Sequence, residues 1–159
     1  MTRVLFVCLG NICRSPTAEG VLRKMAPELR IDSAGIGDWH IGDPPYGPAI
    51  EAAALRGYDL TPLRARQVTP NDFYVFDLIL AMDASNIANL ESIQPSDSTA
   101  DLSLFLEFAP ETREIAVPDP YYTRDFDGAL DLIEMASKGL ISYLSDHPRQ
   151  NTSAVSPKL

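Results

Sequence analysis

The sequence is poor in the features that define several large classes of protein. It contains only two cysteines, Cys8 and Cys13, too few for a disulfide scaffold or a four-thiolate zinc site. Its first apolar run, residues 4–9, is too short for a signal-peptide core, and no run is long enough for a membrane span. Positive charge is scarce, since 13 Lys and Arg against 22 Asp and Glu give a formal net charge of −9. We therefore expect no nucleic-acid partner and no membrane insertion, and a cytoplasmic location where thiols stay reduced.

The remaining composition is that of one ordinary globular domain. The chain has 159 residues, of which 45% are hydrophobic and 22% charged. Apolar, β-branched runs predict strands at 3–8, 31–36, 76–81 and, fourth, 102–108. Helical patterns lie at 15–27, at 48–56, after Asp83 or Ser85, and at 126–144. This alternation predicts an α/β domain with a mostly parallel sheet over residues 1–147. The polar, proline-containing end predicts a flexible tail over 148–159, and a monomer is our default expectation.

The connection between the first strand and the first helix carries the strongest chemical signal. Five residues separate Cys8 from Arg14, and Gly10 and Asn11 form a turn between them. Such a loop can curl so that its amides and the positive end of the helix dipole face a bound phosphate, which Arg14 would grip. The same field favours the thiolate form of Cys8. Ser15 is predicted as the helix N-cap, with Pro16 at the first helical position.

Other interpretations of this loop are weaker. A cysteine at a strand end is more often a packing residue, but the strand before it and the helix start after it favour a reactive site. A nucleotide-binding loop would need Gly-Lys-Ser/Thr or a dinucleotide glycine fingerprint, and neither is present. A thioredoxin-like site would need Cys-x-x-Cys, whereas Cys8 and Cys13 are five positions apart.

A nucleophilic thiolate that attacks phosphorus needs an acid to protonate the leaving oxygen. Asp119 fits this role because Pro118 and Pro120 stiffen its position, although Asp and Pro are also common in simple turns. The prolines also predict that residues 117–123 form no regular element. Tyr121 and Tyr122 follow at once and could wall a slot for an aromatic substrate.

These stretches resemble the low-molecular-weight protein tyrosine phosphatases. The resemblance covers roughly residues 3–145 and rests on 4–19, on 32–35 with 65–67 and 81–86, and on 119–122. It implies a three-layer α/β/α domain with a four-stranded parallel sheet. It also implies tyrosine-phosphorylated proteins as substrates, a phosphate monoester hydrolysed through a cysteinyl-phosphate on Cys8, Asp119 as acid and then base, and no metal or other cofactor.

The resemblance assigns further roles around the loop. Leu9, Gly10, Asn11, Ile12 and Cys13 would hold phosphate or substrate with Arg14. Ser15 would donate to the Cys8 sulfur, and Asn11 would brace the loop with Ser33 as partner. Trp39, Tyr121 and Tyr122 would line the slot. Trp39 supports this because it lies in a polar, glycine-rich loop rather than in a core pattern.

The family contains related activities that the sequence distinguishes in part. Arsenate-reducing relatives need further cysteines, and none follows Cys13. In relatives that act on phosphoarginine a threonine stands where this chain has Ile12, so phosphotyrosine is favoured and phosphoarginine is the alternative. A phosphotyrosine-binding module without activity is a further alternative, which the joint presence of Cys8, Arg14 and Asp119 disfavours.

Two features bear on the loop itself. Leu63 replaces a histidine that supports the bracing asparagine in many relatives, so the hold on Asn11 is expected to differ. Cys8 and Cys13 could approach within disulfide range if the loop curls, which predicts a reversible, protective bridge under peroxide.

Overall fold

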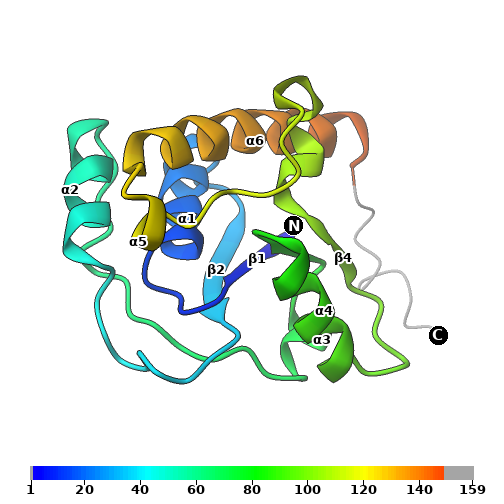
Figure 1. Ribbon diagram of the computed structural model, residues 1–159. Coiled ribbons are helices and arrows are strands. Elements are labelled where there is room, and N and C mark those ends of the chain that lie inside the picture. Colours follow the sequence, from blue (N-terminus) through cyan, green and yellow to red (C-terminus); the bar gives the residue numbers. More distant parts are fainter. Residues whose placement is uncertain (1, 149–159) are drawn as a thin grey trace.

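The computed structural model describes residues 2–148, and its centre is a sheet of four parallel strands (Figure 1). The strands are ordered β2-β1-β3-β4, so the chain passes from β1 to one neighbour and then crosses to the other side of β1. Ligands of such sheets bind beside the carboxyl ends of the strands where the direction of winding changes, which here lies between β1 and β3. The strands are β1 (Arg3–Cys8), β2 (Arg30–Gly35), β3 (Leu78–Ala81) and β4 (Asp101–Leu104).

Alternate residues of β1 build two separate cores. Val4, Phe6 and Cys8 face a cluster that includes residues of α1 (Arg14–Met25) and α6 (Phe126–Asp146). Leu5 and Val7 face the opposite cluster, which includes residues of α3 (Asp72–Val75) and α4 (Ala84–Ile93). This alternation follows from the period of two in a strand that is buried on both faces.

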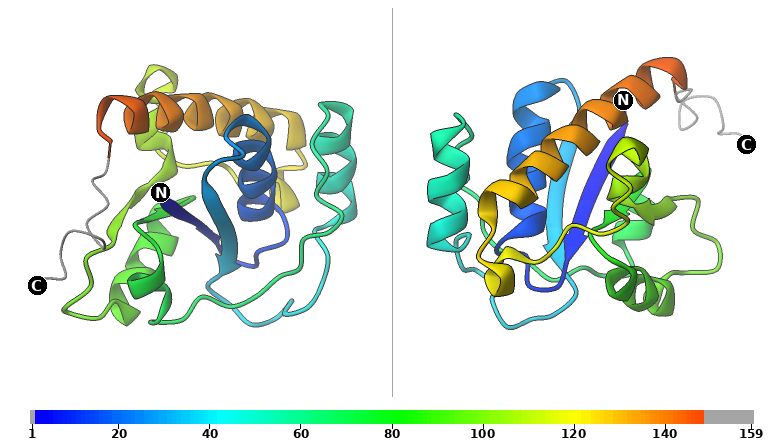
Figure 2. Two further views of the ribbon diagram at one scale, coloured as in Figure 1. Left: turned by 180° about the vertical axis from the view of Figure 1, so that it is seen from behind. Right: turned by 45° about the horizontal axis from the view of Figure 1, so that its top comes forward.

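The helices therefore form a layer on each side of the sheet, and the predicted three-layer α/β/α fold is confirmed. Figure 2 shows α6 crossing the face that α1 also covers. The remaining helical segments are α2 (Gly47–Leu55), α5 (Pro120–Thr123) and the 3-10 turns η1 (Phe105–Phe108) and η2 (Pro110–Thr112).

The start of α1 differs from the prediction. The helix begins at Arg14 with Cys13 at the N-cap position, so the predictions of Ser15 as N-cap and of Pro16 as the first helical residue are both wrong. The hydroxyl of Ser15 lies 3.0 Å from the Cys8 sulfur instead, because the loop draws this side chain inward. Helix α1 gains a different local contact, in which the Thr17 hydroxyl donates to the Cys13 carbonyl over 2.6 Å.

Three other elements differ from the prediction, which was wrong for residues 117–123. Residues 117–123 do contain a regular element, α5, because Asp119 caps it by accepting the Tyr121 amide over 3.0 Å and Pro120 occupies its first position. The fourth strand ends at Leu104 and continues as η1 rather than reaching Phe108. Helix α3 is only one turn long and has no apolar stripe to reveal it.

Two further predictions concern the C-terminal tail and membrane-spanning segments. Apart from its first residue, Pro148, the predicted tail 148–159 lies outside the described residues. Within residues 2–148, no helix combines the length and the apolar character that crossing a bilayer requires.

Candidate active site

The loop between β1 and α1 wraps around the sulfur of Cys8. The amide of Asn11 donates to this sulfur over 3.3 Å, and the Ser15 oxygen lies 3.0 Å from it. The loop achieves this turn because Asn11 adopts a left-handed conformation, with φ at 58°, which asparagine tolerates better than most residues. Two donors directed at one sulfur stabilise a negative charge there.

Asn11 holds the loop through three side-chain hydrogen bonds although it is 98% buried. Its Nδ2 donates to the Ser15 and Ser33 hydroxyls over 2.8 Å and 3.0 Å. The Ser15 oxygen accepts one of these bonds, and its own proton has two acceptors within reach, the Cys8 sulfur at 3.0 Å and the Ala34 carbonyl at 3.4 Å. The Asn11 Oδ1 accepts the backbone amide of Arg66 over 3.0 Å, so main chain holds this oxygen in place.

Glu19 continues this network beneath the loop. Its side chain is 95% buried and accepts the Ser33 hydroxyl over 2.7 Å, while Arg23 pairs with its other oxygen. Burial raises the pKa of Glu19 above the ordinary value, the Ser33 hydrogen bond opposes this rise, Asp32 adds to it, and Arg23 opposes it. The buried carboxylate thereby fixes Ser33 as the partner of Asn11.

Arg14 lies at the edge of the same loop, with its side chain 96% buried. Its Nη1 donates to Asp83 over 2.7 Å and to the Val117 carbonyl over 3.0 Å, and its Nη2 lies 3.5 Å from Asp119. Burial opposes its charge, but Cys8, Asp83 and Asp119 together hold the pKa of Arg14 above its usual value. The guanidinium is thus charged and held in a fixed orientation beside the sulfur.

Asp83 supports this arrangement in a way that the sequence did not reveal. The sequence placed it only just before a predicted helix, and its Oδ1 accepts the Asn86 amide at the start of α4 over 2.9 Å. Its Oδ2 binds Arg14, which is 69 positions away along the chain. The available signal was its place directly after β3, at the same edge of the sheet as Cys8.

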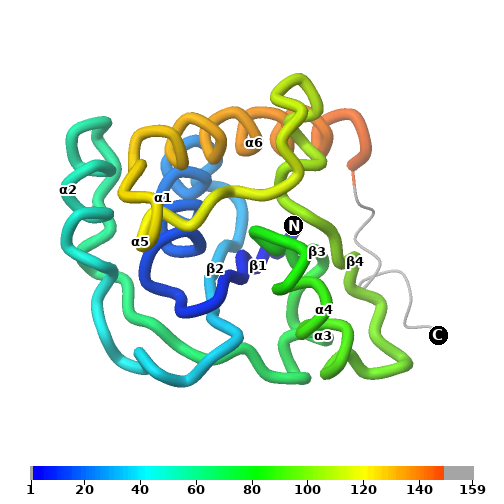
Figure 3. Tube along the Cα trace, viewed as in Figure 1, coloured from blue at the N-terminus to red at the C-terminus, as the bar shows by residue number. Residues whose placement is uncertain are grey.

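Asp119 reaches the site from a distant segment. The stretch before it is tied to the sheet by the Val117 amide, which donates to the Met82 carbonyl over 2.9 Å. Figure 3 shows this segment passing close to the loop that follows β1. The side chain of Asp119 is 23% exposed, so one carboxyl oxygen lies near Arg14 while the group still faces the pocket.

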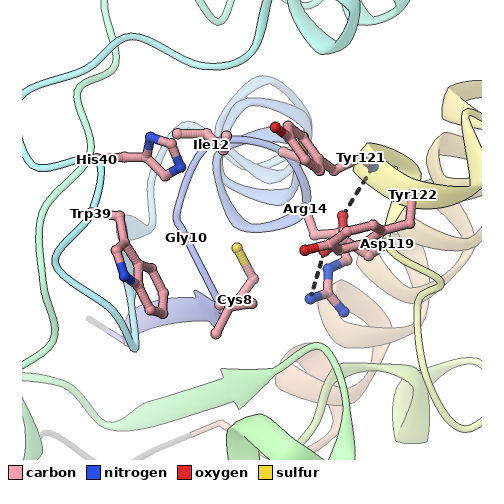
Figure 4. Close-up of a pocket in the computed structure, with 11 residues that line it drawn as sticks. Cys8, Gly10, Ile12, Arg14, Trp39, His40, Asp119, Tyr121 and Tyr122 are labelled. Carbon is pink, nitrogen blue, oxygen red and sulfur yellow. Dashed lines mark hydrogen bonds and ion pairs between the residues drawn. The ribbon is translucent and has the colours of Figure 1, made fainter.

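A cavity of about 300 Å³ joins these groups (Figure 4). Cys8 lies at its base between Trp39 on one side and Asp119 on the other, and Tyr121 and Tyr122 complete the second wall. Of the predicted site residues, Asn11, Ser15 and Ser33 lie behind the loop, and the rest line the cavity. The lining consists of Cys8, Leu9, Gly10, Ile12, Cys13, Arg14, Trp39, His40, Asp119, Tyr121 and Tyr122.

His40 is the lining residue that sequence reasoning missed. Its Nδ1 lies 3.2 Å from Asp43, and a side chain added at Gly10 would meet its ring, so it stands directly over the loop. The signal was its position next to Trp39 in the long, glycine-rich segment after β2. Trp39 itself is 66% exposed and Tyr122 72%, so both present apolar surface at the mouth of the cavity.

The two cysteines have different surroundings. Burial raises the pKa of the Cys13 thiol to about 12, and the charges of Asp119 and Cys8 act in the same direction. Cys13 therefore stays protonated at neutral pH, whereas the Cys8 sulfur accepts the Asn11 amide and lies 3.0 Å from the Ser15 oxygen. Both are free thiols in this structure, and the predicted bridge between them stays a prediction.

Together these groups suit chemistry on a tetrahedral oxyanion. A concave loop at the start of a twelve-residue helix can bind the anion, a sulfur beneath it can attack, and a carboxyl group opposite can transfer a proton. Among residues 2–148, no group of three or more His, Cys, Asp or Glu is placed to hold a metal ion.

Comparison with known proteins gives consistent matches over nearly the whole chain. The family model of the low molecular weight phosphotyrosine protein phosphatases matches residues 3–150. The low molecular weight protein-tyrosine-phosphatase YfkJ of Bacillus subtilis is 41% identical over 150 residues, covering 91% of this chain and 96% of the relative. Its crystal structure matches with a TM-score of 0.88 at 39% identity, covering 94% of this chain and 98% of that one. The crystal structure of a Drosophila arginine phosphatase matches with a TM-score of 0.83 at 30% identity, covering 94% and 100%.

Proposed function

The chain belongs to the low molecular weight phosphotyrosine protein phosphatase family, and from this premise we propose that Cys8, Arg14 and Asp119 carry out its reaction. The protein is a phosphotyrosine protein phosphatase, a hydrolase of phosphate monoesters whose substrates are phosphoproteins. The observation that carries the assignment of residues is the convergence of three distant segments on one cavity.

In the first step, the Cys8 thiolate attacks phosphorus and a sulfur–phosphorus bond forms. The bond between phosphorus and the tyrosine oxygen breaks, and Asp119 transfers its proton to that oxygen, so tyrosine leaves as a neutral phenol. The loop amides and Arg14 bind the three remaining phosphoryl oxygens, where negative charge gathers. Arg14 is suited to this because Asp83 already fixes the plane of its guanidinium.

In the second step, water attacks phosphorus and Asp119, now a carboxylate, accepts its proton. The sulfur–phosphorus bond breaks, phosphate leaves and the Cys8 thiolate returns. The Ser15 hydroxyl, 3.0 Å from this sulfur, stabilises the departing thiolate. Each residue thus begins and ends the cycle in the same protonation state.

The walls of the cavity favour an aromatic substrate. Trp39, Tyr121 and Tyr122 present ring surfaces on its two sides, and Ile12 adds an aliphatic one. The phenol ring of phosphotyrosine would lie between these walls with its phosphate on the loop. Phosphoarginine is the competing substrate to include in every assay, because a Drosophila arginine phosphatase shares the fold.

The composition supports proposals for the partners and the cellular location of the enzyme. A formal net charge of −9 disfavours nucleic acid as partner, and an enzyme that depends on a free thiol suits the cytoplasm. We take the enzyme to act as a monomer without a cofactor. Sedimentation of the purified protein tests the monomer, and activity after treatment with a chelator tests independence from metal.

The covalent step can be tested directly. Mixing the enzyme with phosphotyrosine peptide labelled at phosphorus and quenching in acid should leave label on the peptide fragment that contains Cys8. The label should vanish in Cys8→Ser and form much more slowly in Asp119→Asn, which lacks the acid that protonates the leaving phenol in the first step. Label found on another residue, or no label despite rapid turnover, would contradict the mechanism.

A further inference from the structure

The acid of the proposed mechanism lies beside an element too small to position itself. Helix α5 has four residues, a single turn, and isolated helices of this length are not stable in water. Asp119 caps this turn, so the direction of its carboxyl group depends on where α5 is held. Arg14 lies 3.5 Å from Asp119 and the Val117 amide anchors the chain two residues before it, but neither contact holds the far end of α5.

Tyr46 provides a fixed point on the phosphate-binding loop. Its backbone amide donates to the Ile12 carbonyl over 2.8 Å, which ties the start of α2 to the loop. Pro44 and Pro45 precede it and restrict the backbone. The ring of Tyr46 packs on the ring of Tyr121, with 5.1 Å between centroids.

Arg124 joins this fixed point to α5. Its Nη1 donates to the Tyr46 hydroxyl over 3.0 Å and to the Tyr121 carbonyl over 3.3 Å. Its guanidinium lies 5.3 Å from the centre of the Tyr46 ring and 5.4 Å from that of Phe126. Its backbone is left-handed, with φ at 63°, and its amide closes α5 on the Pro120 carbonyl over 2.9 Å.

We propose that Tyr46 and Arg124 are positioning residues that set the place of Asp119 relative to the phosphate-binding loop. The path runs from the Ile12 carbonyl through Tyr46 to Arg124 and Tyr121, and from there to the cap of α5. This inference rests on the proposed role of Asp119 as acid. It adds that the acid is placed by a contact between α5 and the start of α2, outside the groups that touch phosphate.

A positioning role differs from a merely structural one in how the effect depends on the leaving group. Protonation matters most for phosphotyrosine, whose phenol has a pKa of about 10, and less for p-nitrophenyl phosphate, whose phenol is far more acidic. A misplaced acid therefore lowers kcat/KM for phosphotyrosine peptide more than for p-nitrophenyl phosphate. General loosening of the site lowers both alike.

The test compares Tyr46→Phe and Arg124→Gln with Arg113→Gln. Arg113 is a close control, because it is also an exposed arginine with φ at 63° and its replacement changes the charge equally. We expect Arg124→Gln to lower kcat/KM about tenfold for the peptide and less than about threefold for p-nitrophenyl phosphate. Tyr46→Phe, which removes only the hydroxyl, should also lower kcat/KM more for the peptide than for p-nitrophenyl phosphate. Arg113→Gln should leave kcat/KM unchanged for both substrates.

Combination with Asp119→Asn separates the inference from its premise. If the pair acts through the acid, Arg124→Gln should change kcat/KM less than about twofold in the Asp119→Asn background. Equal losses on both substrates, or full additivity with Asp119→Asn, would overturn the positioning role while leaving Asp119 as acid. If Asp119→Asn alone lowers kcat/KM equally for both substrates, then both proposals are refuted, that of Asp119 as acid and that of its positioning residues.

Discussion

Replacing Asn11 by alanine should be among the most damaging single changes in the phosphate-binding loop. Asn11→Ala removes three buried hydrogen bonds of 2.8, 3.0 and 3.0 Å, each with a net worth of about 1 kcal/mol. Alanine must also adopt a φ of 58°, which adds about 1 kcal/mol relative to a residue that tolerates it. The free energy of unfolding should therefore fall by about 4 kcal/mol.

The measurement is urea unfolding of wild type and variant, followed through the shift in midpoint at constant slope. Asn89→Ala is the matched control, because Asn89 is exposed and donates one side-chain bond, to the Ser85 carbonyl over 2.9 Å. In Asn89→Ala the free energy of unfolding should fall by less than about 1 kcal/mol. In the same samples, kcat/KM of Asn11→Ala should fall by about a hundredfold, because the Asn11 amide no longer holds its place at the Cys8 sulfur.

A loss for Asn11→Ala within about 1 kcal/mol of the loss for Asn89→Ala would refute this reasoning. It would mean that the loop keeps its shape without its buried brace. Unchanged kcat/KM with a large loss of stability would separate the fold of the loop from its chemistry.

Three further predictions follow from the site. Asp119→Asn should lower kcat/KM for phosphotyrosine peptide by about a hundredfold or more, because an amide cannot protonate the leaving phenol, and a loss of less than about tenfold in steady-state kinetics would exclude Asp119 as the acid. Arg14→Lys should lower kcat/KM by about a hundredfold or more although the charge is retained, because lysine cannot bind phosphate and Asp83 together in one plane. A loss of less than about tenfold in steady-state kinetics would contradict this. Because burial raises the folded-state pKa of Glu19, its contribution to stability is full below about pH 4.3, its ordinary pKa, and is lost as pH rises through the raised value. In urea unfolding, the free energy of unfolding of Glu19→Gln should therefore rise relative to that of wild type from pH 4 to pH 7. A difference between the two that stays constant over this range would contradict the argument from the buried carboxyl group.

The elements that carry local signals were predictable from sequence. Strand β1 is a continuous apolar run buried on both faces, and α6 repeats apolar residues at helical spacing. The phosphate-binding loop was predictable because its residues are contiguous, from Cys8 to Ser15. Asp119 could be proposed only because the loop had already created a need for an acid.

The contacts between distant segments were not predictable. Asp83 and Arg14 are 69 positions apart, and Arg124 and Tyr46 are 78 apart, so no spacing in the sequence announces either pair. Ser15 shows where local propensity failed, because its residue type fits an N-cap but its hydroxyl lies 3.0 Å from the Cys8 sulfur, beside which the resemblance had placed it. Tertiary contacts in the folded site outweighed the preference of serine for a helix N-cap at that position.

The most direct test of the account is phosphate release from a phosphotyrosine peptide without added metal, comparing wild type with Cys8→Ser and assaying phosphoarginine alongside. The account predicts rapid release from phosphotyrosine by wild type, none by Cys8→Ser, and little from phosphoarginine. Release from phosphotyrosine that persists in Cys8→Ser would contradict the central claim, that the sulfur of Cys8 is the nucleophile.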